Sequence, residues 1–163
     1  MRDQLDLAAS NQPLDATDVM ILDAIQRDGH LSHAEIGKLV GLAVSSVNER
    51  IRKLVQRGVI LGWQVRLAPE KLGLDLLAFV YVLIDRPENS PAFLDLVSQI
   101  PEIQECHHVA AEWNFVLKVR VRNTAAFEAL LTKHLKAVPG VVRTHTVITL
   151  TSYKDTPALP LRF

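Results

Sequence analysis

The residues of this chain best suited to contacting a charged partner lie between positions 44 and 56. At 100° per residue, one face of a helix over this stretch is apolar and carries Val44, Val47, Ile51, Leu54 and Val55. The opposite face and its flanks carry the polar residues Ser45, Ser46, Asn48, Glu49, Arg50, Arg52 and Lys53. Short donors at the N-terminal end suit DNA base edges, and the cations that follow suit phosphates. The pattern predicts a DNA-binding helix; the alternative is an amphipathic helix that only meets solvent.

A second helical pattern directly before this stretch favours DNA. Ser32 and Glu35 have the spacing of a capping box at a helix N-terminus. Gly41 can end that helix in the left-handed conformation, and Gly37 is small enough to let a crossing helix approach. Two short helices joined by a glycine turn predict a helix-turn-helix, whose second helix usually enters the major groove.

The charge of the chain is zero overall but positive around the second helix. The sequence holds 18 Lys and Arg against 18 Asp and Glu. Residues 43–66 contain five Arg or Lys and one Glu, a net charge of +4, whereas residues 14–42 have a net charge of −3. A positive face on a neutral body is compatible with DNA binding. It predicts modest non-specific affinity, so specific binding would need several copies of the domain.

Histidine and cysteine supply no convincing catalytic or metal site. Cys106 is the only cysteine, so no disulfide and no Cys-based zinc site can form within one chain. His107 and His108 are the obvious acid–base candidates for an enzyme, but neighbours on a strand point to opposite faces. We expect His108 to be packed and His107 to meet a neighbouring subunit. We therefore expect no catalytic residue, metal or cofactor.

Periodicity and turn residues divide the chain into an arm, two domains, a linker and a tail. Asp15 can cap a first helix that ends near Asp28-Gly29, and Val59-Ile60 with Trp63–Leu67 predict a short extended wing. The expected organisation is a flexible arm 1–13, a winged helix-turn-helix domain 14–66, a linker 67–75, a second domain 76–151 and a C-terminal tail 152–163.

The second domain alternates strand and helix patterns. Strands are expected at Leu76–Ile84, Ile103–Val109, Phe115–Arg122 and Val141–Thr151. One helix follows the cap Ser90 with Pro91 at its first position, and another begins at Thr124. The order β-α-β-β-α-β is that of a ferredoxin-like domain. The fold class is therefore α+β.

Several short segments, taken in their order and spacing, resemble the leucine-responsive/asparagine-responsive regulator (Lrp/AsnC) family of bacterial and archaeal transcription factors. The resemblance covers roughly residues 14–151 and implies a sequence-specific DNA-binding regulator. The segments that carry it are Leu14–Asp18, Ile21-Leu22, Gly41-Leu42, Val47, Arg50-Ile51, Leu54, Gly58–Ile60, Cys106–Val109, Leu117–Val119, Pro139–Val141, Thr144 and Thr146.

The resemblance also implies partners: double-stranded DNA, a homodimer formed through the ferredoxin-like domains and often assembled into an octamer, and a small effector such as an amino acid. In the family the effector site lies in the loop after the second strand, with a pattern close to Val-Thr-Gly-x-x-Asp-Tyr. The residues at that loop here are Ala110, Ala111, Glu112, Trp113 and Asn114.

This loop departs from the family pattern in ways that disfavour an ordinary amino-acid effector. Ala111 adds a methyl group where backbone approaches a ligand, and Asn114 removes a carboxylate that could pair with an α-ammonium group. Trp113 either lines a less polar pocket or packs against a neighbouring subunit. A further departure is Ala43, which replaces the serine that usually caps the recognition helix, although Ser45 or Ser46 could shift the helix start.

The remaining sequence features favour a cytoplasmic protein. The N-terminus has no apolar signal-peptide segment, and the longest apolar run, Leu76–Ile84, is nine residues, too short for a membrane helix. The alternative to a specific regulator is a DNA-compacting protein with little sequence specificity, which the same mixed polar and cationic helix face would allow.

Overall fold

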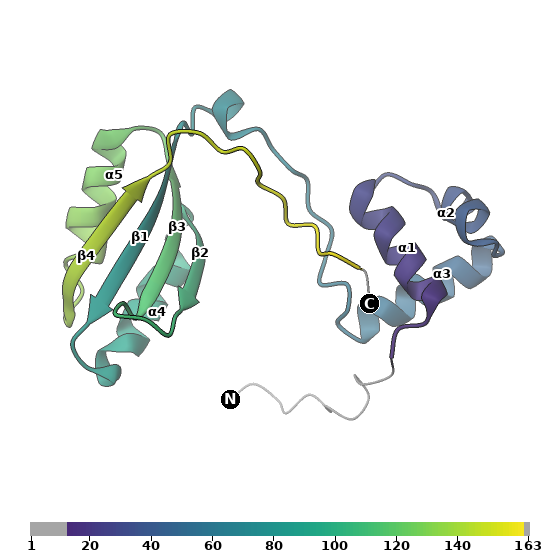
Figure 1. Cartoon of the computed structure of the whole chain (residues 1–163), viewed down its shortest axis with the longest axis horizontal. Helices are drawn as coiled ribbons and strands as arrows, with labels where there is room; N and C mark the ends of the chain where they lie inside the picture. The colour runs from purple at the N-terminus through teal and green to yellow at the C-terminus, as the bar shows by residue number, and fades with distance from the viewer. Residues whose placement is uncertain (1–12, 162–163) are drawn as a thin grey trace. The chain divides into compact units, whose positions relative to one another are not determined.

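The computed structural model describes residues 13–161 and divides them into two compact units. One unit contains the described residues up to Arg66 together with those from Asp155 onward, and the other is Leu67–Lys154. The flexible arm expected at 1–13 lies outside the described residues except for Pro13. Each unit is described by itself (Figure 1).

Three helices form the first unit: α1 (Ala16–Arg27), α2 (His33–Val40) and α3 (Val44–Gln56). Asp15 caps α1 by accepting a hydrogen bond from the Asp18 backbone N–H. The expected capping box between Ser32 and Glu35 is present at α2, and Gly41 ends α2 with φ 70°. The helix-turn-helix prediction is therefore confirmed, including its end signals.

The core of this unit is narrower than the apolar pattern predicted. Ile21, Ile36, Val47 and Ile51 form a buried cluster. Val44 and Val55 were expected on the buried face of α3 but are 50% and 46% exposed. The buried residues of α3 are Val47, Ile51 and Leu54, whereas Val44 is its first residue and Val55 its last but one.

Gly37 is required for a different close approach from the one expected. A Cβ atom at Gly37 would lie 2.6 Å from the Leu42 carbonyl oxygen, whereas the nearest atom of α3, on Val47, would be 3.7 Å away. The Leu42 N–H donates to the Gly37 carbonyl at 2.9 Å. Glycine at position 37 therefore allows the backbone of the turn at Leu42 to approach closely. The crossing helix α3 is only in ordinary van der Waals contact with it.

The segment after α3 contains no paired strand. The expected wing was Val59-Ile60 and Trp63–Leu67, but residues 57–68 have no strand partner. Ile60 still packs against the helical core. From Leu61 to Leu67 apolar and other residues alternate, and the apolar ones are all exposed: Leu61 (94%), Trp63 (57%), Val65 (83%) and Leu67 (63%). An extended segment with no neighbouring strand cannot form a ladder, which explains the difference.

The second unit is a four-stranded antiparallel sheet with both long helices on one face (Figure 1). Its elements are η1 (Pro69–Leu72), β1 (Leu76–Ile84), η2 (Pro87–Asn89), α4 (Ser90–Gln99), β2 (Ile103–His108), β3 (Phe115–Val121), α5 (Thr124–Leu130), the π-helical turn η3 (Leu131–Leu135) and β4 (Val141–Ile148). The order β2-β3-β1-β4 and the β-α-β-β-α-β succession confirm the ferredoxin-like prediction.

Alternate residues of the strands and one face of each helix form the core of this sheet. Ala78, Val80 and Val82 of β1 are fully buried beside Phe93 of α4. Ser90 was expected to cap α4 but is its first residue. Asn89 holds the cap position without a side-chain cap bond, and its Nδ2 donates to Asp85 Oδ1 at 2.7 Å.

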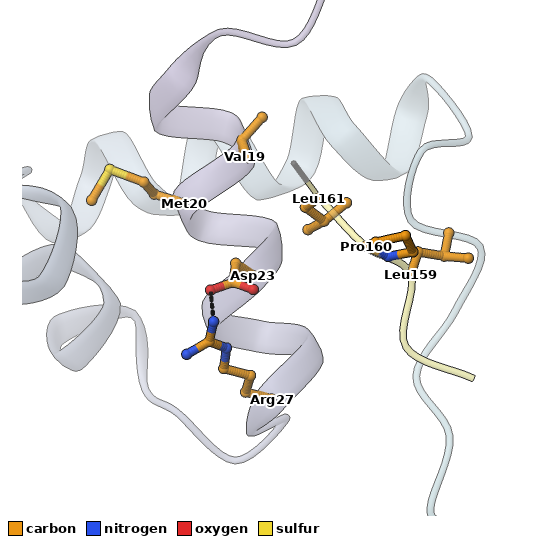
Figure 2. Close-up of a pocket in the computed structure, with 7 residues that line it drawn as sticks. All are labelled: Val19, Met20, Asp23, Arg27, Leu159, Pro160 and Leu161. Atoms are coloured by element: carbon orange, nitrogen blue, oxygen red, sulfur yellow. Dashed lines mark ion pairs between the residues drawn. The ribbon is translucent and has the colours of Figure 1, made fainter. Parts of the chain in front are cut away.

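The C-terminal tail, expected at 152–163, folds back onto the first unit. From Asp155 onward it belongs to the unit formed by α1, α2 and α3. The Gln26 side chain of α1 forms two hydrogen bonds with the Leu159 backbone. Figure 2 shows Leu159, Pro160 and Leu161 opposite α1, across a hollow of about 550 Å³ lined on the helix by Val19, Met20, Asp23 and Arg27.

Candidate DNA-binding face and effector loop

Six of the seven polar residues singled out on α3 are exposed on the outer surface of that helix. Ser45, Ser46, Asn48 and Glu49 are exposed along its first half. The side chains of Arg52 and Lys53 follow, at 54% and 62% exposure. The opposite face is anchored in the core by Val47, Ile51 and Leu54. The outer face therefore presents short polar groups first and cations second, on a helix fixed from behind.

Arg50, the seventh residue, is directed to α1 instead. Its Nη1 atom lies 2.7 Å from Asp15 Oδ2 and 2.7 Å from Asp18 Oδ1. The Asp18 backbone N–H, and next the Arg50 guanidinium, lower the pKa of Asp15 below its ordinary value. The two carboxylates in turn raise the pKa of Arg50. Arg50 thus ties the recognition helix to the N-terminus of α1.

The two cations on the outer face share one carboxylate. Arg52 donates to both carboxylate oxygens of Glu49, at 3.0 and 2.7 Å, and Lys53 Nζ lies 3.6 Å from Glu49 Oε1. The hydrogen bond from Arg52 lowers the pKa of Glu49. The three side chains together carry one net positive charge, and Glu49 holds the cations against the helix.

The N-terminus of α3 lacks a side-chain cap, as the sequence suggested. Ala43 occupies the cap position, and its carbonyl accepts from the Ser46 and Val47 backbone N–H groups. The helix begins at Val44, so neither Ser45 nor Ser46 shifts its start.

The loop between β2 and β3, predicted as the effector site, is clipped to β1 by Asn114. The Asn114 backbone N–H donates to the Val82 carbonyl at 3.0 Å, and its side-chain Oδ1 accepts from the Ile84 N–H at 2.6 Å. A third bond, from the Val109 N–H to the Asn114 carbonyl at 2.9 Å, closes the loop. The amide that replaces the family's carboxylate therefore has a structural role in its own chain.

Trp113 packs on the open face of its own sheet. Its ring stacks on His145 with centroids 5.9 Å apart, and the Tyr81 ring lies 6.2 Å away. The Arg143 guanidinium carbon sits 4.5 Å from the Trp113 ring centroid, a cation–π contact. Ala110, Ala111 and Glu112 are exposed beside this cluster, and Glu112 lies 3.9 Å from Arg143.

Sequence reasoning missed the partners of Trp113. Tyr81 and His145 face each other because β1 pairs with β4 in a register that places Tyr81 opposite His145. Both side chains lie on the face of the sheet that points away from the core. The alternation of side chains along each strand could have predicted this face from the sequence. The register of β1 against β4 was the missing information.

The histidine pair is exposed and contributes no catalytic arrangement. His107 lies 3.3 Å from Glu105, which also accepts from Lys118 at 3.1 Å. Burial raises the pKa of Glu105, but the bonds to Lys118 and His107 outweigh it and lower that pKa overall. The expectation that His108 is packed was wrong: it is exposed at the end of the edge strand β2, with its ring 5.2 Å from Phe115.

Neighbouring Cys106 is half-buried against the sheet core, and this burial raises the pKa of its thiol. Within residues 13–161, no three His, Cys, Asp or Glu side chains gather in a way that could hold a metal ion. The same described residues contain no helix long and apolar enough to cross a membrane.

Comparison with known protein families gives a separate match for each unit. Residues 77–159 match the Lrp/AsnC ligand binding domain, and residues 14–60 match the winged helix-turn-helix DNA-binding domain.

Relatives and solved structures extend over nearly the whole chain. A leucine-responsive regulatory protein of Haemophilus influenzae is 36% identical over 154 residues, which cover 93% of each chain. The HTH-type transcriptional regulator FL11 of Pyrococcus horikoshii is 37% identical over 92% of this chain and 98% of its own. A crystal structure of a Neisseria meningitidis transcriptional regulator in complex with L-Met has a TM-score of 0.88 at 29% identity, over 91% of this chain and 97% of that one.

Proposed function

This chain is a DNA-binding transcriptional regulator of the Lrp/AsnC family, and we propose that it reads DNA with the exposed face of α3 and responds to a small molecule at the loop between β2 and β3. The observation that carries the DNA-binding surface is the division of α3 into a buried apolar face and an exposed polar face. The contact residues we propose are Ser45, Ser46, Asn48, Glu49, Arg52 and Lys53.

Arg50 has a supporting role in this proposal. Its guanidinium is bonded to Asp15 and Asp18 and is only one-third exposed. A group held by two carboxylates gains little by exchanging them for a phosphate. We therefore assign Arg50 to fixing the angle of α3 against α1, and the base and phosphate contacts to the residues around it.

A homodimer is the assembly that fits this DNA-binding unit. The outer face of α3 carries little net charge, so a pair of tethered units gains affinity through effective concentration. The edge strand β4 exposes Val142, Val147 and Ile148 at 45–60%, and Leu61–Leu67 exposes alternate apolar residues. Such apolar surface fits a second copy of the chain, and further pairing would give an octamer. A two-fold dimer requires a pseudo-palindromic site.

The effector that we propose differs from a simple aliphatic amino acid. Asn114 is neutral, and its side-chain oxygen is already bonded to Ile84. Glu112 is the one carboxylate between Val109 and Phe115, and it lies near Arg143. We propose that an effector lies against Ala110, Ala111 and Trp113 and that free leucine or asparagine binds weakly. The protein performs no chemical step in this proposal, and it acts in the cytoplasm, where its DNA partner lies.

The deciding experiment compares two double variants on DNA from the region upstream of the gene. Arg52→Ala/Lys53→Ala removes both cations from the outer face of α3, and Lys133→Ala/Lys136→Ala removes two exposed cations, one in η3 and one directly after it. The first is expected to weaken specific binding about 5- to 150-fold, equivalent to 1–3 kcal/mol, with a smaller salt dependence. The second should bind as the wild type does.

Two other results would contradict the proposed function. Wild-type affinity in a folded Arg52→Ala/Lys53→Ala protein would exclude α3 as the DNA-contacting helix. Equal affinity of the wild type for the upstream DNA and for a scrambled duplex would replace specific regulation with DNA compaction.

A further inference from the structure

We propose that Asp155–Leu161 is a strap that docks on α1 and couples the end of β4 to the DNA-binding unit. Nothing in the proposed function requires this segment. Its docking can be tested without DNA, and only its effect on DNA affinity rests on the proposed function.

The polar anchor of the strap is the Gln26 side chain, which bonds the backbone of the strap as the backbone of a neighbouring strand would. Gln26 Nε2 donates to the Leu159 carbonyl at 2.9 Å, and the Leu159 N–H donates to Gln26 Oε1 at 2.8 Å. One primary amide thus satisfies both backbone groups of a residue 133 positions away. Pro157 and Pro160 flank this residue and fix φ on either side, which favours an extended chain that an amide can grip.

The apolar part of the contact is loose. Leu161 is partly buried, whereas Leu159 remains 68% exposed. A hollow of about 550 Å³ remains between the strap and α1, with the Asp23–Arg27 ion pair, 2.8 Å long, on its helix side (Figure 2). A core segment would fill this space, because protein interiors are close-packed. The strap is therefore held by a few specific contacts and can be released.

A second anchor lies where the strap begins. The Arg66 guanidinium donates to the Asp155 carbonyl. Arg66 is the last residue of the first unit before the chain enters the second, and Asp155 is the first residue after the chain returns. The chain therefore passes between the units twice, and this hydrogen bond joins the two passages. A unit attached through two joined passages has fewer accessible orientations than one attached through a single linker.

The strap also lies on a route, made of side-chain contacts and the covalent chain, that leads from the candidate effector loop to α3. Trp113 of the loop contacts Arg143 and His145 on β4. β4 ends at Ile148, and after six intervening residues the chain enters the strap at Asp155. The strap binds Gln26 of α1. The N-terminal end of α1 holds Arg50 of α3 through Asp15 and Asp18. A shift of β4 can thus alter the strap, and release of the strap can alter α1.

Hydrogen–deuterium exchange on the full chain tests the docking. Gln26→Ala removes the amide anchor, and Gln99→Ala removes an exposed glutamine at the end of α4 as a matched control. Leu161→Asp and Leu150→Asp form a second pair, because Leu150 is 96% exposed and lies outside the strap. We expect the Leu159 amide to exchange at least threefold faster in Gln26→Ala and Leu161→Asp than in either control. Equal exchange in all four variants would overturn the docked strap.

DNA affinity of the same variants tests the coupling. Release of the strap is expected to weaken binding to the upstream duplex severalfold, because the freed unit samples more orientations. Faster exchange with unchanged affinity would overturn the coupling. If the Arg52→Ala/Lys53→Ala variant also binds normally, the α3 proposal has failed, and the exchange result still decides whether the strap docks.

Discussion

The helix α3 and the loop between β2 and β3 make opposite use of their polar side chains. On α3, six of the seven residues singled out from the sequence are exposed, and only Arg50 is tied to another helix. In the loop, the aromatic ring of Trp113 and the side-chain amide of Asn114 contact their own sheet. The polar side chains of α3 are therefore exposed to a partner, whereas those of the loop are already bonded within the chain.

This difference separates two ways of meeting a partner. DNA can contact α3 without disturbing the packing of that helix, apart from the hydrogen bonds that Glu49 makes with Arg52. An effector at the loop must fit around a formed cluster of Tyr81, Trp113 and His145, or displace part of it. The proposed DNA surface is thus preformed, whereas binding at the proposed effector loop would compete with internal contacts.

The largest effect is expected from Arg50→Met. This change leaves the Asp18 side chain, only 11% exposed, without its cation. The pair is only partly buried, since the Arg50 side chain is 33% exposed, and we expect a loss of about 2–3 kcal/mol in the stability of the helical unit, less than for a fully buried pair. Arg52→Met, on an exposed pair, should cost less than about 0.5 kcal/mol. Thermal unfolding followed by circular dichroism compares them, and equal losses would show that Arg50 does not support α3.

Asn114→Ala is expected to have the next largest effect. It leaves the Ile84 N–H without an acceptor and should destabilise the sheet unit by about 2 kcal/mol. Asn114→Asp retains an oxygen in place and should be closer to the wild type. Urea unfolding measures both, followed by the fluorescence of Trp113 in a Trp63→Phe background, because Trp63 in the first unit also fluoresces. A fully stable Asn114→Ala protein would mean that the loop is held by Trp113 alone and that the amide is free for an effector.

Asp15 predicts a smaller loss of stability in acid. Its pKa is lowered from the ordinary value of 3.8 by the Asp18 N–H and then by Arg50. A depressed pKa in the folded state means that the carboxylate stabilises above pH 3.8 and that this contribution disappears as pH falls through the lower folded pKa. Asp15→Asn keeps the cap but removes the titration. Its melting temperature should fall less than that of the wild type between pH 5 and pH 2.5, and equal falls would show that the ionised Asp15 does not stabilise the helical unit.

The smallest effect concerns the charge of α3 itself. Glu49→Gln removes the carboxylate that holds Arg52 and Lys53, so both cations become available to phosphates. The slope of log affinity against log salt should steepen by about 1, with little change in stability. An unchanged slope would mean that Glu49 does not compete with DNA for these cations, and a loss of affinity would give Glu49 a direct contact with a base.

Local signals in the sequence predicted most of the fold. Asp15, the Ser32–Glu35 capping box and Gly41 act within a few residues, and each appears where expected. The bounds of β1 also agree, because a continuous apolar run has clear ends. The Glu49–Arg52 pair could have been predicted as well, since residues three apart on a helix are neighbours.

Contacts between distant residues were beyond the sequence pattern. Arg50 looked like one more cation on a helix flank, and only the packing of α3 on α1 brings it to Asp15 and Asp18. Trp113 required the pairing of β1 with β4 to acquire His145. Gln26 and Leu159 are 133 residues apart and have no periodic relation at all.

That last contact makes the DNA-binding unit discontinuous in the gene. A chimaeric regulator that joins residues 1–66 of this chain to the second domain of a relative would transplant α1, α2 and α3 but replace the residues that meet Gln26. Codons 155–163 would have to be transferred as well, as a second cassette after the foreign domain. Exchanging the domains of this regulator is therefore a three-part splice rather than a single junction.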